Sequence, residues 1–246
     1  PLYSFLLGFT EALNNPGLET MFVLVQLVNA AVFIFSIAAF HFFVKSIRRS
    51  CKENLAAERV LVPDWLWVSM AWALFMWSSI KAIRVSTVTP DLLVSGVYYV
   101  ILAVIIRIFS GRQVWQEYFR LGLLLGAAYL AKAPLFLLAL MIFTVFGILA
   151  ITRYLHVSWL SLLGGFLIIA GPWILLLSID KGSITFGESG SLNYAWFVNG
   201  VPNDLHWRGG TEGNGVPVHP TEQLSSNPAV YAYPEPVGGT YPAGYD

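Results

Sequence analysis

The chain has 246 residues, of which 57% are hydrophobic and only 11% are charged, and its mean hydropathy is +0.66. Because an ordinary soluble domain has roughly 25% charged residues, this composition excludes a water-soluble fold for most of the chain and indicates a membrane protein. The formal net charge is zero, so the total charge says nothing about nucleic-acid or acidic partners. We expect membrane lipids and no nucleic acid as partners, and the lone Cys51 excludes an internal disulfide and a cysteine-based metal site.

The apolar segments predict an all-α membrane fold. Residues 1–10 are apolar with an aromatic edge but too short to cross a bilayer, which favours a helix lying at the interface. Longer apolar runs predict transmembrane helices at residues 21–44, 63–80, 91–108, 118–131, 134–152 and 157–178. The pattern is therefore typical of a polytopic bundle of about six transmembrane helices with an interfacial helix.

The composition changes after the last of these runs. Residues 179–246 have no long apolar run and are rich in Gly, Pro, Asn and Tyr. We therefore predict a transmembrane domain at residues 1–178 and the start of a loop-rich extracytoplasmic region at residues 179–246. Because the chain begins at Pro1 and ends inside a run rich in Gly, Pro and Tyr, we also expect it to be a fragment of a longer protein.

The distribution of basic residues predicts the orientation. If the basic loop at residues 45–59 is cytoplasmic, alternation of the helices places nine Lys and Arg residues on that side and five on the other. This bias agrees with the positive-inside rule. The segments at residues 1–19 and 78–91, Lys132 and everything after residue 178 then lie outside the cytoplasm.

One charge separates two apolar runs. Lys132 lies between residues 121–130 and 135–150, which contain no other charge. Because Pro134 lacks an N–H group and disfavours helix at the preceding residue, we predict two helices that meet at Lys132 instead of one of about thirty residues. A charge between such runs lies at the membrane surface or is buried for a function.

Other charged residues are predicted to share the outer face with Lys132. Lys81 and Arg84 run against the positive-inside trend, which an anionic ligand such as a lipid phosphate would explain. Snorkelling to lipid head groups is the alternative. Asp91 follows Thr89 and Pro90, so it is equally well explained as an acidic residue in the first turn of a helix that Thr89 caps.

The outer tail contains a second polar group of residues. His206, Trp207 and Arg208 follow Asp204 and precede His219. The spacing matches no pair of metal ligands on a helix, and no cysteine supports a site, so we expect no metal here and favour contact with a sugar or peptide acceptor. The sequence also contains no phosphate-binding glycine loop, nucleophile elbow or zinc-protease motif, so nothing favours nucleotide-driven or zinc chemistry.

Three segments together resemble the GT-C class of polytopic glycosyltransferases. They are Pro1-Leu2-Tyr3 before the interfacial helix, the run Ser-Thr-Val-Thr-Pro-Asp at residues 86–91, and the run Gly-Ala-Ala-Tyr-Leu-Ala-Lys-Ala-Pro at residues 126–134. Within this class, the chain resembles bacterial members that are similar to dolichyl-phosphate-mannose protein mannosyltransferases and to the aminoarabinose transferase of lipid A.

This resemblance implies transfer of a sugar from a polyprenyl-phosphate donor to a lipid, glycan or protein acceptor. It places the protein in the bacterial inner membrane, with the C-terminal part outside the cytoplasm and membrane lipids as further partners. The catalytic Asp of the family is expected upstream of Pro1, so residues 1–246 alone are expected to be inactive. Family members differ in metal dependence, so a divalent metal is a possible cofactor.

The resemblance also assigns roles to residues of this chain. Asp91 matches a supporting carboxylate, and Lys132 matches the lysine beside the lipid phosphate. Lys81, Arg84 and His206 are further candidates for binding the lipid phosphate or the substrate.

Two other functions stay open at the level of sequence. Polar residues within predicted spans, namely Gln26, Asn29 and His41, and the break at Lys132 suggest a transporter or flippase. Against it, no second broken segment provides the paired halves that such transporters usually show. In a non-catalytic membrane scaffold, Lys132 would only snorkel to the lipid head groups.

Overall fold

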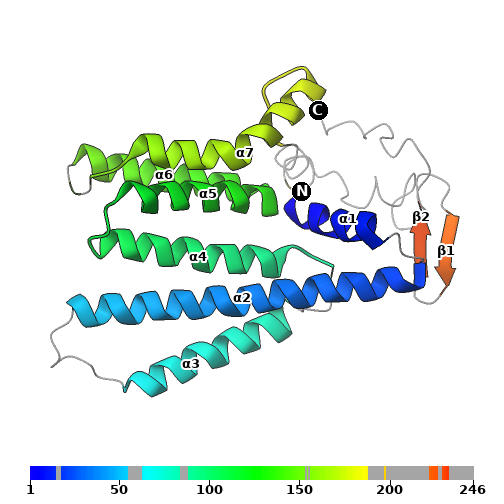
Figure 1. Cartoon of the computed structure of the whole chain (residues 1–246), viewed down its shortest axis with the longest axis horizontal. Coiled ribbons are helices and arrows are strands. Elements are labelled where there is room, and N and C mark those ends of the chain that lie inside the picture. Colours follow the sequence, from blue (N-terminus) through cyan, green and yellow to red (C-terminus); the bar gives the residue numbers. More distant parts are fainter. Residues whose placement is uncertain are drawn as a thin grey trace. The chain divides into compact units, whose positions relative to one another are not determined.

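The computed structural model describes residues 1–14, 18–54, 63–83, 88–152, 154, 156–187, 197, 222–226 and 229–232. Contacts divide the chain into two compact units, Pro1–Phe186 and Gly187–Asp246. The described part of the first unit is helical, which confirms the predicted all-α class for this region (Figure 1).

The first unit contains successive helices that run in alternating directions along one axis (Figure 1). They are α1 (Leu2–Asn14), α2 (Leu18–Asn54), α3 (Asp64–Trp77), the π-helical turn η2 (Ser78–Ala82), α4 (Asp91–Phe109), α5 (Trp115–Ala131), α6 (Leu135–Ile151) and α7 (Trp159–Lys181). In the second unit, β1 (Glu222–Ser226) and β2 (Ala229–Ala232) pair as an antiparallel hairpin with one irregularity in register, which the sequence did not predict.

Among the described residues, three helices are long and apolar enough to cross a membrane. They are Phe22–Lys52 within α2, Asp91–Phe109 and Trp159–Ile179 within α7. Helices α5 and α6 have 17 residues each. At 1.5 Å per residue such a helix covers about 25 Å, somewhat less than the ~30 Å hydrocarbon core. The structure thus supports a membrane protein but not all of the six predicted spans.

Helix α2 extends further than predicted. The sequence predicted a basic loop from residue 45, but α2 continues through this segment to Asn54. Lys and Arg are good helix formers, and basic residues near a helix C-terminus interact favourably with the helix dipole. Asp64 at the start of α3 also pairs with Arg48 at 2.6 Å and with Lys52 at 3.3 Å. Cys51 accordingly lies exposed on a helix and not in a loop.

The start of α4 also differs in detail from the prediction. Pro90, not Thr89, is the capping residue, and no side chain caps the helix. The Pro90 carbonyl accepts a hydrogen bond from the backbone N–H of Val94 at 2.9 Å. Asp91 does lie in the first turn, where a carboxylate interacts favourably with the positive end of the helix dipole.

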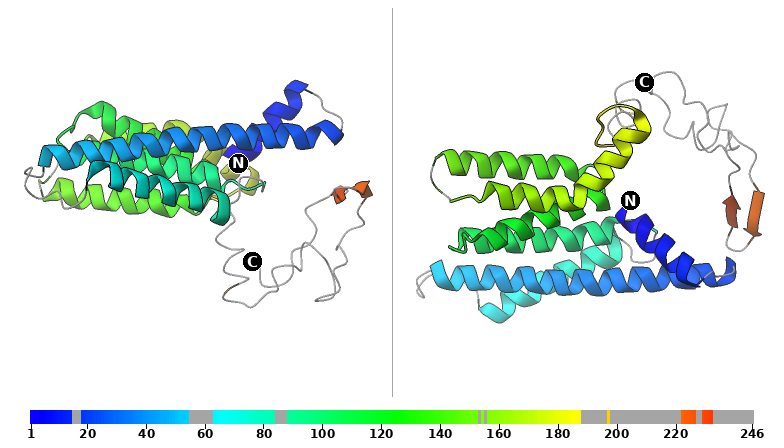
Figure 2. Two further views of the ribbon diagram at one scale, coloured as in Figure 1. Left: turned by 90° about the horizontal axis from the view of Figure 1, so that it is seen from below. Right: turned by 45° about the horizontal axis from the view of Figure 1, so that its top comes forward.

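Helix α5 lies at the centre of the packing, between α4 and α7, with α6 beside it (Figure 2). It buries Leu121 and Leu125 completely. Two glycines bring its backbone against that of α7. A Cβ atom added at Gly122 would lie 2.1 Å from the carbonyl oxygen of Leu162, and one added at Gly165 would lie 2.4 Å from that of Phe119. Small residues at such crossings are typical of helix pairs in membranes.

Aromatic rings join α2, α3 and α4. The ring of Phe40 stacks on that of Phe75 with centroids 4.5 Å apart, and it meets Trp72 and Tyr99 edge-on at 5.1 Å each. Offset and edge-to-face pairs contribute about 0.5–1.5 kcal/mol each beyond the area they bury. This cluster therefore fixes α3 against α2 and α4.

Candidate functional site

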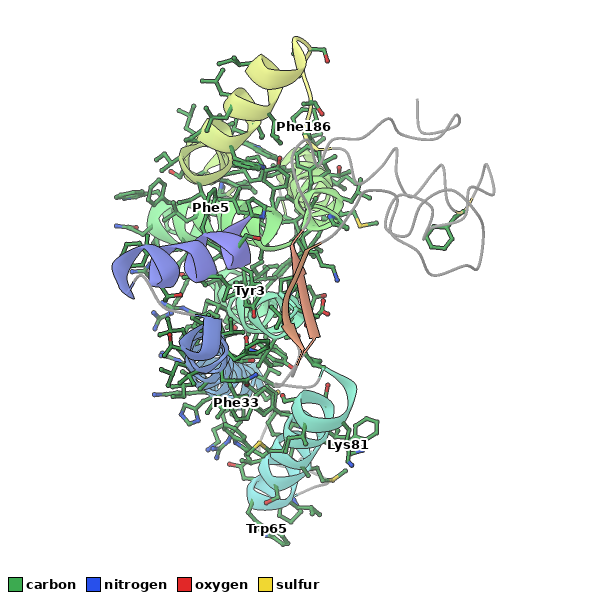
Figure 3. All side chains as sticks on the ribbon, turned by 90° about the vertical axis from the view of Figure 1, so that its right-hand side faces the viewer. Tyr3, Phe5, Phe33, Trp65, Lys81 and Phe186 are labelled. Atoms are coloured by element: carbon green, nitrogen blue, oxygen red, sulfur yellow. The ribbon has the colours of Figure 1, made fainter. Side chains whose placement is uncertain are left out.

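The two ends of the bundle carry different polar groups. We call the end formed by the C-terminus of α5 and the N-termini of α4 and α6 the Lys132 end. The opposite end, formed by the C-termini of α2 and α4 and the N-terminus of α5, is called the basic end. Figure 3 views the molecule from the side that Figure 1 draws on the right, where α4 begins and α5 ends.

Lys132 lies in a tight turn between α5 and α6. Its backbone is extended, with φ −155° and ψ 120°, and its N–H donates to the carbonyl of Ala128 at 3.0 Å. The carbonyl of Lys132 then accepts the N–H of Leu135 at 2.9 Å, which starts α6 directly after Pro134. Proline cannot continue the ladder of α5, so the chain reverses here and the two helices form a hairpin.

This turn brings the side chain of Lys132 to Asp91. The ammonium Nζ donates to Oδ1 of Asp91 at 2.7 Å, across 41 residues of sequence. The two side chains remain 48% and 43% exposed. A half-exposed ion pair contributes only about 0–1 kcal/mol to stability, so an anion that reaches Lys132 can replace Asp91 at little cost.

The segment after α7 is attached to this end. The hydroxyl of Tyr129 donates to the backbone carbonyl of Phe186 at 2.7 Å, and the ring of Phe186 stacks on Phe136 at 4.6 Å. These contacts join the residues after α7 to the helical unit, which ends at Phe186. The predicted division at residue 178 concerns membrane and extracytoplasmic regions, and it stays a prediction.

Helix α1 is attached to α2 by a buried hydrogen bond. The hydroxyl of Tyr3 donates to Oδ1 of Asn29 at 2.6 Å, and burial raises the pKa of Tyr3 above its ordinary value. Asn29 thus has a partner within the protein. Gln26 and His41, the other polar residues that suggested a transporter, are exposed on α2.

Replacing Tyr3 with Phe is expected to lower the free energy of unfolding by about 1–3 kcal/mol, since it leaves the buried carbonyl of Asn29 without this donor. The matched control is Tyr98→Phe, because Tyr98 is 40% exposed and its hydroxyl removal is expected to stay within about 0.5 kcal/mol. Unfolding in mixed micelles, followed by tryptophan fluorescence, measures both variants. Equal effects would contradict the assigned role of the bond.

The remaining predicted site residues are not brought to the ion pair. Lys81 is exposed on η2 and forms no ion pair within the described part of the chain. Figure 3 shows it on the opposite side of this end from Phe186. Arg84 and His206 lie outside the described residues, as do Asp204, Trp207, Arg208 and His219.

No metal centre is visible among the residues that the structure describes, since none of them form a group of three or more His, Cys, Asp or Glu side chains. The possible divalent metal therefore stays a prediction.

A charge cluster that the sequence did not predict lies at the basic end. Glu117 in the first turn of α5 is 3% exposed, and it pairs with Arg107 of α4 and, at 3.2 Å, with Arg120. The ring of Phe42 lies 5.8 Å from the guanidinium carbon of Arg107. The available signal was that Glu117 is the only acidic residue between Asp91 and Asp180. An isolated carboxylate beside apolar runs requires a cationic partner.

No protein-family model matches the chain, and comparisons with curated proteins and with solved structures also give no match.

Proposed function

We propose that the helical unit is the membrane domain of a bacterial glycosyltransferase that uses a polyprenyl-phosphate-linked sugar, and that Lys132 binds the donor phosphate. The observation that carries the proposal is the half-exposed ion pair between Lys132 and Asp91 at one end of the bundle. The resemblance of residues 86–91 and 126–134 to GT-C enzymes supports the same assignment.

The ion pair between Lys132 and Asp91 is suited to reversible binding of the donor phosphate. Without donor, Asp91 holds the ammonium in place at 2.7 Å. The phosphodiester of the donor carries one negative charge, as a carboxylate does, and its oxygens compete for the same ammonium. The phosphate monoester that is left after transfer carries more negative charge than the diester. During transfer, an acceptor hydroxyl attacks the anomeric carbon and gives its proton to the catalytic Asp expected upstream of Pro1. The bond from the anomeric carbon to the phosphate oxygen breaks, and its electron pair stays on the phosphate. A fixed cation there offsets the developing charge.

The distribution of charge supports the proposed orientation. Among described residues, the basic end carries Lys45, Arg48, Arg49, Lys52, Arg107, Arg112 and Arg120. The positive-inside rule would place this end in the cytoplasm of a bacterial inner membrane. Lys132 and the segment that follows α7 would then face the outside, where a lipid, glycan or protein acceptor is available.

The described residues give less support to a transporter. Discontinuous helices of transporters break near the bilayer midplane, within one span. Here the turn at Lys132 joins two neighbouring helices at the end of the bundle (Figure 1). Asn29 is engaged by Tyr3, as described above.

Binding of polyprenyl phosphate to the complete protein tests the proposal without knowledge of the sugar or the acceptor. Replacing Lys132 with Ala is expected to weaken binding roughly 10- to 150-fold, because a hydrogen bond to a charged group contributes about 1.5–3 kcal/mol. Lys52→Ala is the matched control, since Lys52 pairs with Asp64 at the basic end. Competition against a labelled donor analogue in nanodiscs measures the affinities.

The uncharged polyprenyl alcohol provides a second control, because its binding should not depend on Lys132. Sugar transfer from polyprenyl-phosphate donors in proteoliposomes should fall in the Lys132→Ala variant in parallel with binding. Unchanged affinity for polyprenyl phosphate in Lys132→Ala would reject the phosphate role.

A further inference from the structure

A small cavity lies between α2 and α4 at the basic end. Its volume is about 120 Å³, and its lining includes Lys45 and Arg49 from α2, Arg107 from α4, and Arg112 just after α4. No described acidic side chain lines it. A space of this size suits a compact anion and not an extended polyanion.

Hydroxyl groups complete the polar wall. Ser50 of α2 and Ser110, directly after α4, both line the cavity, and the hydroxyl of Ser110 donates to that of Ser50 at 2.8 Å. This bond holds the ends of the two helices together. The cavity is therefore built from two helices that are fixed relative to each other.

Arg107 is held in position at this cavity. It pairs with the buried Glu117, and its guanidinium lies over the ring of Phe42. Its Nε atom is nevertheless buried without a hydrogen-bond partner among the described residues. The side chain of Arg107 as a whole is 24% exposed, so its charge acts on the cavity that it lines.

Charge around the cavity is unbalanced. The described carboxylates at this end are Asp64, which pairs with Arg48 and Lys52, and Glu117, which pairs with Arg107 and Arg120. Neither Lys45 nor Arg112 pairs with a described carboxylate. Lys45 and Arg112 therefore bring positive charge to the cavity that no ion pair with a described carboxylate neutralises.

We propose that this cavity binds a phosphate group, and that its source is the head group of an anionic phospholipid. Phe42 and Ile106 line its apolar side, and residues 22–44 and 92–106 beyond it carry no charge, so acyl chains can follow the helix surfaces away from the head group. Basic pockets between membrane helices bind such head groups. The bound phosphate bridges α2 and α4 and stabilises the basic end, independently of any chemistry at Lys132.

Thermal unfolding of the full chain in nanodiscs tests this site. In phosphatidylcholine discs, adding phosphatidylglycerol is expected to raise the midpoint of unfolding. The double variant Lys45→Gln/Arg112→Gln should bind phosphatidylglycerol roughly 25-fold more weakly, because each cation near an anionic lipid surface contributes about fivefold. Native mass spectrometry of the retained lipid measures this loss directly.

The matched control is Arg48→Gln/Lys52→Gln, which removes the same charge from the same end but outside the cavity. Phosphatidylglycerol should still raise the midpoint of unfolding of this control variant. It should do the same for Lys45→Arg/Arg112→Lys, which retains both charges. Inorganic phosphate, added to discs of pure phosphatidylcholine, tests a soluble source of the phosphate. If it raises the midpoint of unfolding of the unmodified protein but not of Lys45→Gln/Arg112→Gln, the cavity is a phosphate site whose ligand is free phosphate. Equal responses of the two Gln double variants, or no response to either probe, would overturn the proposal.

Discussion

Replacing Glu117 with Ala is expected to lower the free energy of unfolding by about 3–5 kcal/mol, because removing one partner of a buried ion pair leaves the other charge uncompensated. Glu117 is 3% exposed, and the side chain of Arg107, its partner on α4, is 24% exposed. Arg120, the second partner, is 56% exposed and can turn to water. Most of the loss therefore arises at Arg107.

The control for this substitution is Asp64→Ala. Asp64 also pairs with two cations, and hydrogen bonds from Arg48 and then Lys52 hold its pKa below the ordinary value, but its side chain is 52% exposed. Exposed pairs are screened by water and contribute little to stability, so this loss should be small although the change in net charge is identical. Denaturation in mixed micelles compares the two variants. A similar loss at both positions would show that burial of Glu117 contributes little.

A double variant separates loss of the pair from loss of packing. Glu117→Leu/Arg107→Met removes both charges and keeps apolar volume at both positions. Buried ion pairs can often be replaced by apolar residues with little loss, so the double variant should be more stable than Glu117→Leu alone. If Glu117→Leu and the double variant are equally unstable, the uncompensated charge on Arg107 is not the cause.

The lengths of the apolar runs and the positions of the proline residues predicted much of the fold. The helix predicted at residues 91–108 is observed as Asp91–Phe109, because Pro90 and the polar residues after Phe109 limit the apolar run at both ends. The turn at Lys132 followed from Pro134 alone. For the C-terminal part of α2 the sequence predicts a loop, because basic residues end the apolar run there, but no residue in this part breaks a helix.

Contacts between helices were harder to predict. Alternation placed Asp91 and Lys132 on the same side of the bundle, but their separation of 2.7 Å depends on how α4 packs beside α5. The pairing of Glu117 with Arg107 depends on the same packing. The periodicity of apolar residues and the positions of helix-breaking residues can be read from a single sequence, but they do not predict which faces of two helices pack together.

Replacing Gly165 of α7 with Ala is expected to lower the free energy of unfolding by about 3 kcal/mol. This is the upper end of the usual range for overpacking. The added methyl carbon would lie 2.4 Å from the carbonyl oxygen of Phe119 and 3.0 Å from the backbone nitrogen of Leu123. Both atoms belong to the backbone of α5, so no rotation of a side chain relieves the contact. The two helices must separate, which also weakens the contact around Gly122.

The neighbouring glycine provides the matched control, because a Cβ atom at Gly164 would meet nothing within 4 Å. Both substitutions change the intrinsic helix preference equally, by about 1 kcal/mol in favour of Ala, so Gly164→Ala should be neutral or slightly stabilising. The difference in unfolding free energy between the two variants then measures the α5–α7 contact alone. If Gly165→Ala were as stable as Gly164→Ala, α5 and α7 could not approach as closely as the structure places them, and the position of the Lys132 turn relative to α7 would have to be revised.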